Sequence, residues 1–483
     1  MKYLTKLTLT LLLVSNLTTA INLGSLDTSF SQDGTSDGWA LYNESDTDPN
    51  HSVKFTDVLV DSQGRIIVAA SDNYDSGNSI LFGVELLRYL PNGTLDSSFG
   101  TNGSLVIPFE TNSENSLHIK MALNTIDGII LAFSYNPNTS NGMDIVVLQY
   151  NSAGTKIGEQ RFGFDFGTTS ARRDDNLKDL IYIPSLSKVA ITAEIERTTA
   201  GDSDFGIALL DMNQATGALT LDTNFSGDGK DACYFDQDIN NTTDTDTPSS
   251  ITFEENSQTL IIGGSAFEGN GTNGNGWNMA FCEFDLQGSE LRKWSTQGGN
   301  VEFEKASDVQ YGVDESNIPS LYVAGTVDGP DGNTDIYIAR YQRNVFTSDW
   351  VLDLGFGNSN GFNTVGLSML FIGDTDDEAA ELFLESDGSI LLSATGFGTG
   401  SAFGMTSLVK FNQEGKVYNS WGIGDGIANN IIHQSPGIYD FVNAVTEDPS
   451  TGEIYVVGSV QASRHLGFIA NMYNDIIFAN SFD

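Results

Sequence analysis

The chain alternates short apolar runs with turns rich in Gly, Asn, Asp and Ser, and one order of pieces recurs seven times. The first piece is an aliphatic run after a turn, and successive copies are separated by 60 to 71 residues. These runs begin at Ile66, Ile129, Val189, Leu260, Leu321, Ile390 and Ile454. Runs of this length with period-2 alternation predict strands, and no longer window shows a helical period of 3.6 residues.

A second apolar run follows each first run after a polar loop and ends at an aromatic residue or Met. The seven ends are Tyr89, Tyr150, Met212, Phe284, Tyr341, Phe411 and Tyr473. A third piece, Leu-Asp-x-x-Phe followed shortly by Gly, begins at Leu26, Leu95, Leu221 and Leu352, with degenerate versions near Phe162, Trp294 and Trp421. Each unit therefore carries about four short strands.

Seven four-stranded units predict an all-β fold, a seven-bladed β-propeller of antiparallel blades in a single domain spanning residues 22–483. The approximate repeats are 22–92, 93–153, 154–216, 217–287, 288–344, 345–414 and 415–483. A ring must close, because an open edge invites edge-to-edge association. Either the strand near Leu26–Phe30 or the terminal strand Ile477–Phe482 is expected to complete a blade begun at the other end of the chain.

The repeats resemble the delta-60 repeat, a family of bacterial β-propeller-like repeats. The resemblance rests on Leu87-Arg-Tyr89 and on the segment from Asn92 to Gly103, which contains Leu95-Asp-Ser-Ser-Phe99; Gln63-Gly-Arg-Ile-Ile-Val-Ala69 and Ala339-Arg-Tyr341 also fit. It covers nearly the whole chain and implies a fold but no reaction. The recurring Phe30, Phe99, Phe225 and Phe356 are expected to pack between blades, because an active site is normally built only once.

Residues 1–20 have the pattern of a signal peptide. Lys2 and Lys6 precede a short apolar stretch, and Thr18 and Ala20 supply small residues before a cut after Ala20. The stretch is too short to span a bilayer, which needs about 20 residues. We therefore expect an exported protein without a membrane span, located in the periplasm, at the cell surface or in the medium.

The net charge of the chain argues against some classes of binding partner. The chain has 64 Asp and Glu against 22 Lys and Arg, which gives a formal net charge of −42. Binding to nucleic acid requires clustered Lys and Arg, so we do not expect it here. A high net charge also suppresses self-association, so we expect a monomer.

The loop from Asp328 to Asp335 is a candidate Ca²⁺ site. Asp328, Asp331, Asn333 and Asp335 offer four oxygen-bearing side chains within eight residues, and Ca²⁺ prefers oxygen ligands. The loop lacks the spacing of an EF-hand. A solvated acidic loop is the alternative, because such clusters arise by composition in a chain with so many acids.

Cys233 and Cys282 are the two cysteines of the chain. In an exported protein such a pair can form a disulfide, and two buried thiols are the alternative. The four histidines, His51, His118, His433 and His465, lie far apart in sequence, and none has a second His or Cys at metal-ligand spacing. We find no Gly-x-Ser-x-Gly nucleophile elbow in a strand-turn-helix setting.

These observations favour a non-catalytic, exported propeller that binds a protein, glycan or surface component. The contact elements would be the long loops Asp37–His51, Asp236–Ser249 and Gly264–Asn278. One alternative is a secreted polysaccharide hydrolase or lyase with acids or Ca²⁺ in the central funnel, and another is a structural cell-surface protein. Exposed aromatic residues on one face would favour binding, whereas Arg, His, Tyr and carboxylates converging in one pocket would favour an enzyme.

Overall fold

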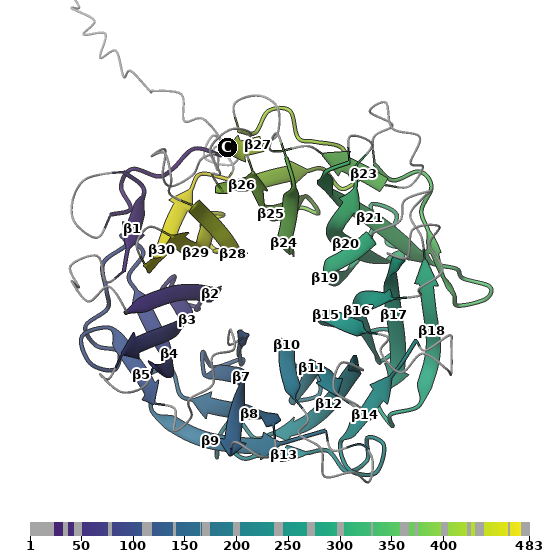
Figure 1. Cartoon of the computed structure of the whole chain (residues 1–483), viewed down its shortest axis with the longest axis horizontal. Coiled ribbons are helices and arrows are strands. Elements are labelled where there is room, and N and C mark those ends of the chain that lie inside the picture. Colours follow the sequence, from purple (N-terminus) through teal and green to yellow (C-terminus); the bar gives the residue numbers. More distant parts are fainter. Residues whose placement is uncertain are drawn as a thin grey trace, which may run out of the picture.

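Seven antiparallel sheets stand around a central axis (Figure 1), which confirms the all-β, seven-bladed propeller. The computed structural model describes residues 24–31, 37–42, 51–75, 80–108, 118–138, 142–164, 166, 174–196, 203–235, 245–267, 276–296, 304–329, 332–357, 367–370, 372, 375–397, 404–422, 427–429, 439–461 and 464–474. The predicted signal peptide and the terminal segment Ile477–Phe482 lie outside these residues. Within the described ranges no helix is long and apolar enough to cross a membrane.

Each blade is a meander in which the first strand lines the central axis and the fourth lies at the rim. Blade I contains β2 (Ser52–Val60), β3 (Ile66–Asp75), β4 (Ile80–Tyr89) and β5 (Ser104–Pro108), and blade II contains β6 (Ile119–Leu123), β7 (Ile129–Asn138), β8 (Gly142–Tyr150) and β9 (Lys156–Phe162). Blade III contains β10 (Asp175–Ile183), β11 (Lys188–Glu196), β12 (Ser203–Met212), β13 (Leu219–Leu221) and β14 (Lys230–Cys233).

The remaining blades follow the same order. Blade IV contains β15 (Asp246–Glu254), β16 (Thr259–Phe267), β17 (Trp277–Asp285) and β18 (Glu290–Thr296), and blade V contains β19 (Glu304–Val313), β20 (Pro319–Asp328), β21 (Thr334–Arg343), β22 (Trp350–Leu352) and β23 (Leu367–Leu370). Blade VI contains β24 (Asp377–Leu384), β25 (Ile390–Phe397), β26 (Gly404–Phe411) and β27 (Ile427–Asn429). Blade VII contains β28 (Tyr439–Glu447), β29 (Ile454–Gln461), β30 (His465–Met472) and the N-terminal strand β1 (Trp39–Leu41).

The N-terminal segment closes the ring. Strand β1 pairs antiparallel with β30, so a segment from the start of the chain supplies the rim strand of the last blade. The preceding residues extend this contact: the amide of Gly24 donates to Tyr473 O at 2.7 Å, and the hydroxyl of Tyr473 donates to the carboxylate of Asp27 at 2.6 Å. The closing strand comes from the N-terminal part of the chain, but it is Trp39–Leu41 rather than the expected strand near Leu26–Phe30, where Leu26 forms a single bridge to Met472. The other expected strand, Ile477–Phe482, lies outside the described residues.

Apolar side chains fill the contact between every pair of neighbouring blades, in seven clusters that each combine residues of two blades. The Leu-Asp-x-x-Phe motif belongs to these contacts. Phe99 is fully buried and lies beneath the turn at Gly154 in blade II, where an added Cβ would come within 2.8 Å of its ring. Gly154 also has φ +82°, a conformation that favours glycine.

The Asp of the motif holds an arginine that bridges two blades. The Nε of Arg88 donates to Asp96 at 2.8 Å, its Nη1 donates to the carbonyl of Ser152 in blade II, and its guanidinium lies 4.6 Å from the Phe99 ring centroid. Arg340 repeats this arrangement in blade V, with Asp353 at 2.6 Å and the carbonyl of Gln413 in blade VI at 3.0 Å. The motif is therefore a structural clamp between blades, as the sequence predicts for its Phe residues.

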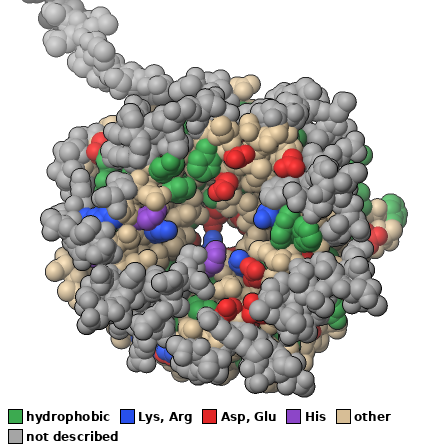
Figure 2. All heavy atoms as spheres, in the orientation of Figure 1, with side chains coloured by type: hydrophobic (Ala, Val, Ile, Leu, Met, Phe, Trp, Pro, Cys, Tyr) green, Lys and Arg blue, Asp and Glu red, His purple; other side chains and the backbone are tan. Residues whose placement is uncertain are grey.

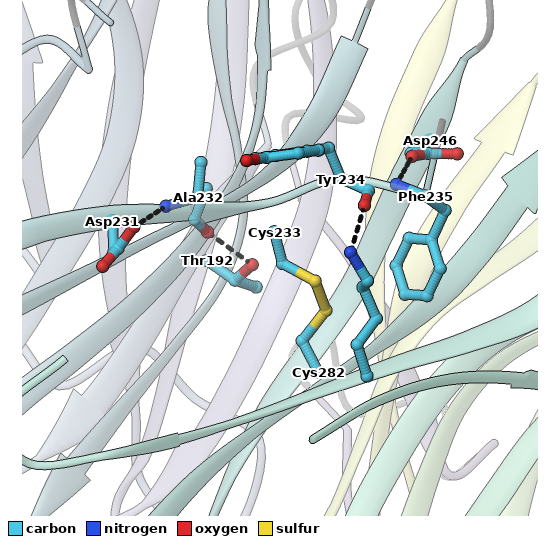
Figure 3. The surroundings of a disulfide bond; sticks show 10 residues. Thr192, Asp231, Ala232, Cys233, Tyr234, Phe235, Asp246 and Cys282 are labelled. Atoms are coloured by element: carbon cyan, nitrogen blue, oxygen red, sulfur yellow. Dashed lines mark hydrogen bonds between the residues drawn. A yellow bond between two sulfur atoms is a disulfide. The ribbon is translucent and has the colours of Figure 1, made fainter. Parts of the chain in front are cut away.

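A disulfide joins Cys233 of β14 to Cys282 of β17, which confirms the predicted pair. Figure 3 shows this bond and its surroundings. The two Cα atoms are 6.5 Å apart, and both side chains are fully buried. Although both cysteines lie in one sequence repeat, β14 belongs to blade III and β17 to blade IV. The bond is thus a covalent link between neighbouring blades.

Replacing both cysteines by Ala should lower the free energy of unfolding by about 2–4 kcal/mol, because the link restricts the unfolded chain over a loop of 49 residues. Guanidinium unfolding with and without reductant measures the effect. Reductant should lower the midpoint of the native chain and leave that of the double variant unchanged. Equal midpoints for the oxidised native chain and the variant would contradict a stabilising role.

Candidate functional site

The described ends of the long connections lie at one end of the blades, which we call the loop face. The first strand of each blade begins at this face and the second strand ends there, since the blades are antiparallel meanders. The described ends of the three long loops singled out from the sequence, such as His51, Phe267 and Trp277, lie here, and the loop interiors lie largely outside the described residues. Figure 2 looks onto this face, with Lys or Arg, His and acidic side chains around the central opening.

A ring of polar side chains lines the channel at one level. In six of the seven blades the first strand has a β-bulge near this level. The equivalent position is polar in six blades and is occupied by Asp57, Lys120, Asp179, Ser250, Asp308 and Glu381, with Ala444 in the seventh.

Most members of the ring accept a backbone N–H from the next blade. The amide of Met121 donates to Asp57 at 2.6 Å, and that of Leu382 donates to Asp308 at 2.9 Å. Ser250 and Glu381 accept in the same way from blades V and VII. We call this set of contacts the inner latch, because it fixes the first strand of one blade against the first strand of the next.

Lys120 is the exception, since an ammonium group cannot accept an N–H. Its Nζ instead reaches across the channel to Glu381 of blade VI at 3.3 Å. Burial alone would lower the pKa of Lys120, but Glu381, Asp57, Asp179 and Asp308 raise it well above its usual value. Lys120 therefore carries a positive charge among four carboxyl groups.

Burial raises the pKa values of the three Asp residues of the ring. The pKa rises to about 7 for Asp57 and Asp308 and to about 6 for Asp179, although the Lys120 ammonium opposes the rise in each case. Between roughly pH 4 and 7 the folded chain thus binds more protons at these sites than the unfolded chain does. These three groups reduce the free energy of unfolding as the pH rises through that window.

Two cavities meet at this ring. The lower one, of ≈ 280 Å³, contains Asp57, Asp179, Asp308 and Glu381 in its wall. The upper one, of ≈ 480 Å³, opens toward the loop face and is called the vestibule here. Its charged or titratable side chains are Lys54, His118, Lys120 and Lys178, and its neutral polar ones are Thr56, Ser71, Thr247, Ser249, Ser307 and Asn443.

The charged side chains that line the vestibule are lysines, whereas the whole chain is strongly acidic. None of the described residues that line it is Asp or Glu, in a chain with a net charge of −42. Removal of bulk water and the nearby Lys178 and Lys120 lower the pKa of His118 to about 4, so its imidazole is neutral at pH 7. The vestibule therefore combines three ammonium groups with a neutral imidazole and several hydroxyls.

The candidate Ca²⁺ residues lie on the hairpin between β20 and β21. Asp328 ends β20, and Asp335 is buried in β21 with its carboxylate close to Gly329. The amide of Gly329 donates to the carbonyl of Asn333 at 2.7 Å, which closes the turn, and Asp331 lies outside the described residues. In the described part of the chain no group of three or more His, Cys, Asp or Glu is arranged to hold a metal ion. The Ca²⁺ site remains a prediction.

Three of the four histidines reach the loop face, and His433 lies outside the described residues. His51 contacts Asp72 through Nε2 at 2.6 Å, at the seam between blades VII and I. His465 lies at the same seam, where burial and Lys54 lower its pKa to about 4. His118 stands apart in the channel mouth.

The sequence reasoning missed Lys54, Lys120 and Lys178. These lysines could have been found from their position in the repeat. Each lies on the first strand of its blade, within three residues of the position where the β-bulge occurs. Aligning the seven repeats at the bulge, rather than at the Leu-Asp motif, would have placed Lys120 in a column with Asp57, Asp179, Asp308 and Glu381.

Comparisons with known proteins give fold likenesses at low identity. No protein-family model matches the chain, and no curated protein matches its sequence. A Trypanosoma rangeli sialidase in complex with sialic acid is 11% identical over 78% of this chain, with a TM-score of 0.41, and the match spans 56% of the sialidase. The GH93 α-L-arabinofuranosidase of Fusarium graminearum with arabinobiose is 9% identical over 74% of this chain and 92% of its own, with a TM-score of 0.41. Sqt1 from Chaetomium thermophilum is 10% identical over 85% and 81% of the two chains, with a TM-score of 0.42. We draw no functional conclusion from likenesses at this level.

Replacing Lys120 by Met should destabilise the fold more at pH 8 than at pH 5.5. At pH 8 the variant leaves ionised carboxylates facing one another without their cation, at a cost of about 1–3 kcal/mol for this partly buried pair. At pH 5.5 the raised pKa values leave Asp57, Asp179 and Asp308 mostly protonated, so less stability is lost. Thermal melts at both pH values measure the difference.

Lys156→Met is the control for this measurement, because Lys156 pairs with Glu159 at an exposed position on blade II. It should have little effect at either pH. An equal loss of stability for Lys120→Met at the two pH values would contradict the assigned electrostatic role.

Proposed function

We propose that the protein is an exported, non-catalytic propeller that binds a glycan on its loop face. The observation that carries this proposal is a set of partly exposed aromatic side chains at the loop-face ends of the strands. Figure 2 shows hydrophobic patches on this face. The half-buried aromatic residues at these strand ends are Phe267, Trp277, Phe397, Tyr439 and Phe441.

The aromatic residues form two groups on different blades. Phe267 and Trp277 end and begin the two strands of one hairpin in blade IV, with their ring centroids 5.5 Å apart. Tyr439 and Phe441 stack at the start of β28 with their centroids 6.2 Å apart, and Phe397 of blade VI packs against Phe441. A flat ring that is apolar on its face and held in place by a neighbouring ring suits the C–H face of a sugar. Rings on separate blades suit an extended chain of sugars.

Export is supported by two features. The first is the signal-peptide pattern of residues 1–20. The second is the buried disulfide Cys233–Cys282, because disulfides persist mainly in oxidising compartments. We also propose that the repeats are of the delta-60 type, on the basis of the Leu-Asp-x-x-Phe and Arg-Tyr segments that form the clamp between blades.

A secreted polysaccharide hydrolase or lyase is the second candidate. The observation that favours it is the group of three Asp carboxyls in the channel, because a carboxylic acid with a pKa of 6–7 can serve as a general acid near neutral pH. Against it, Asp57, Asp179 and Asp308 each accept one backbone N–H from the next blade and a second from the residue that follows them. Both of their oxygens therefore already have structural partners.

Electrophoresis of the mature protein through gels containing neutral or acidic polysaccharides tests the proposal. We expect at least one polysaccharide to retard the protein. Trp277→Ala and Tyr439→Ala should each weaken this binding by roughly 5- to 30-fold, as expected for losing about 1–2 kcal/mol of aromatic contact.

Phe346→Ala is the matched control. Phe346 is 94% exposed, but it follows the end of β21 and so lies at the end of the blade away from the loop face. Its loss should not change the retardation. New reducing ends or unsaturated products in the same incubations would instead favour the enzyme, and no retardation by any polysaccharide would overturn the glycan proposal.

A further inference from the structure

We propose that the vestibule is an anion site for the carboxylate of an acidic sugar, so that the glycan bound on the loop face contains uronic acid. This inference rests on the proposed glycan-binding function and names its ligand class. It follows from the wall of the vestibule, which carries three lysines and no carboxylate among its described residues.

The three lysines differ in how far their charge is already neutralised. Lys120 pairs with Glu381 at 3.3 Å at the vestibule floor, and Lys178 pairs with Glu194 at 2.8 Å. Lys54 forms no ion pair within the described part of the chain, and its side chain is partly exposed. Lys54 is therefore the ammonium group most available to a ligand.

The other polar groups of the vestibule suit a hydroxylated ligand. Thr247, Ser71 and Ser307 place hydroxyls in its wall, and His118 is a neutral imidazole that can donate or accept. A cavity of ≈ 480 Å³ lies within the range of pockets that take small organic ligands, about 300–1,000 Å³. A lone inorganic anion would leave most of these hydroxyls unused.

The lysine region is continuous with one aromatic group. The Nζ of Lys305 lies 4.3 Å from the Trp277 ring centroid. Burial lowers the pKa of Lys305; the Glu194 carboxylate opposes this fall and the Lys178 ammonium adds to it. Lys178 in turn lines the vestibule. A sugar stacked near Trp277 would thus have ammonium groups on its channel side.

The acidic ring beneath sets the depth of the site. Asp57, Asp179, Asp308 and Glu381 line the lower cavity, and Lys120 is the residue common to both cavities that carries a positive charge. An anion entering from the loop face meets attraction in the vestibule and repulsion below Lys120. The carboxylate would therefore stop at the level of Lys120.

Calorimetric titration of the mature protein with trigalacturonate and with its methyl ester tests the inference, because the ester keeps the sugar rings and removes the charge. We expect the acid to bind at least about tenfold more tightly than the ester, the loss expected for one charge-assisted contact. Lys54→Gln should bring the affinity for the acid close to that for the ester.

The pair Lys178→Gln with Glu194→Gln removes the second ammonium together with its counter-ion and should also weaken binding of the acid. Lys156→Gln, on the rim strand of blade II, is the charge-matched control and should leave binding unchanged. A sulfated trisaccharide in place of trigalacturonate separates recognition of carboxylate from recognition of any sugar-borne anion; tighter binding of the sulfated sugar would overturn the assignment to uronic acid.

Equal affinity for acid and ester, or unchanged binding by Lys54→Gln, would overturn the anion site. The two proposals fail in different ways. If neutral polysaccharides retard the protein through Trp277 while the acid has no advantage, the glycan function stands and the acidic class falls. If no saccharide binds in either assay, both fall.

Discussion

The propeller depends on one repeated contact at its axis, in which a side chain at the bulge of one first strand accepts a backbone N–H from the next. Buried N–H groups need partners, and first strands of separate sheets cannot supply them through ordinary ladder pairing. Asp57, Asp179, Ser250, Asp308 and Glu381 provide these acceptors. The requirement for acceptors explains why acidic groups gather in the narrowest part of the molecule, where their mutual repulsion is greatest. The positive charge of Lys120 offsets that repulsion, but its ammonium group cannot accept a backbone N–H from the next blade.

At the periphery, adjacent blades are held by different chemistry. The Arg88–Asp96 and Arg340–Asp353 pairs each reach a carbonyl of the following blade, while Phe99 lies beneath a glycine turn. Trp421 packs in the same way beneath Gly24 of the last blade, where an added Cβ would come within 3.0 Å of the indole ring. The N-terminal segment therefore packs on Trp421 of blade VI, at the position where a turn of blade II packs on Phe99 of blade I. Different contacts therefore hold the blades together at the axis and at the rim.

The fold could be predicted from the sequence because its strand pattern repeats, whereas the candidate site could not be predicted. Seven copies of one strand pattern define the blades, and a single cysteine pair leaves one possible disulfide. The sequence did not show that Cys233 and Cys282 belong to different blades, because each Leu-Asp repeat begins with the rim strand of the preceding blade. Lys54, His118 and Lys178 come from three positions that no local motif connects; the closed ring alone brings them together. The choice between the two closing strands likewise depended on long-range pairing that local patterns do not encode.

The seam between β1 and β30 also has a kinetic consequence. Trp39 pairs with Ala470, so the interface that closes the ring joins the first and last parts of the chain. Contacts of such sequence separation are slow to form, because loop closure precedes the gain in contacts. If the chain crosses a membrane with its N-terminus first, strand β1 stays unpaired until Ala470 and the rest of β30 have also crossed. Closure of the ring would then wait until transport is almost complete. Until that point, the disulfide between blades III and IV could stabilise the blades that have already folded.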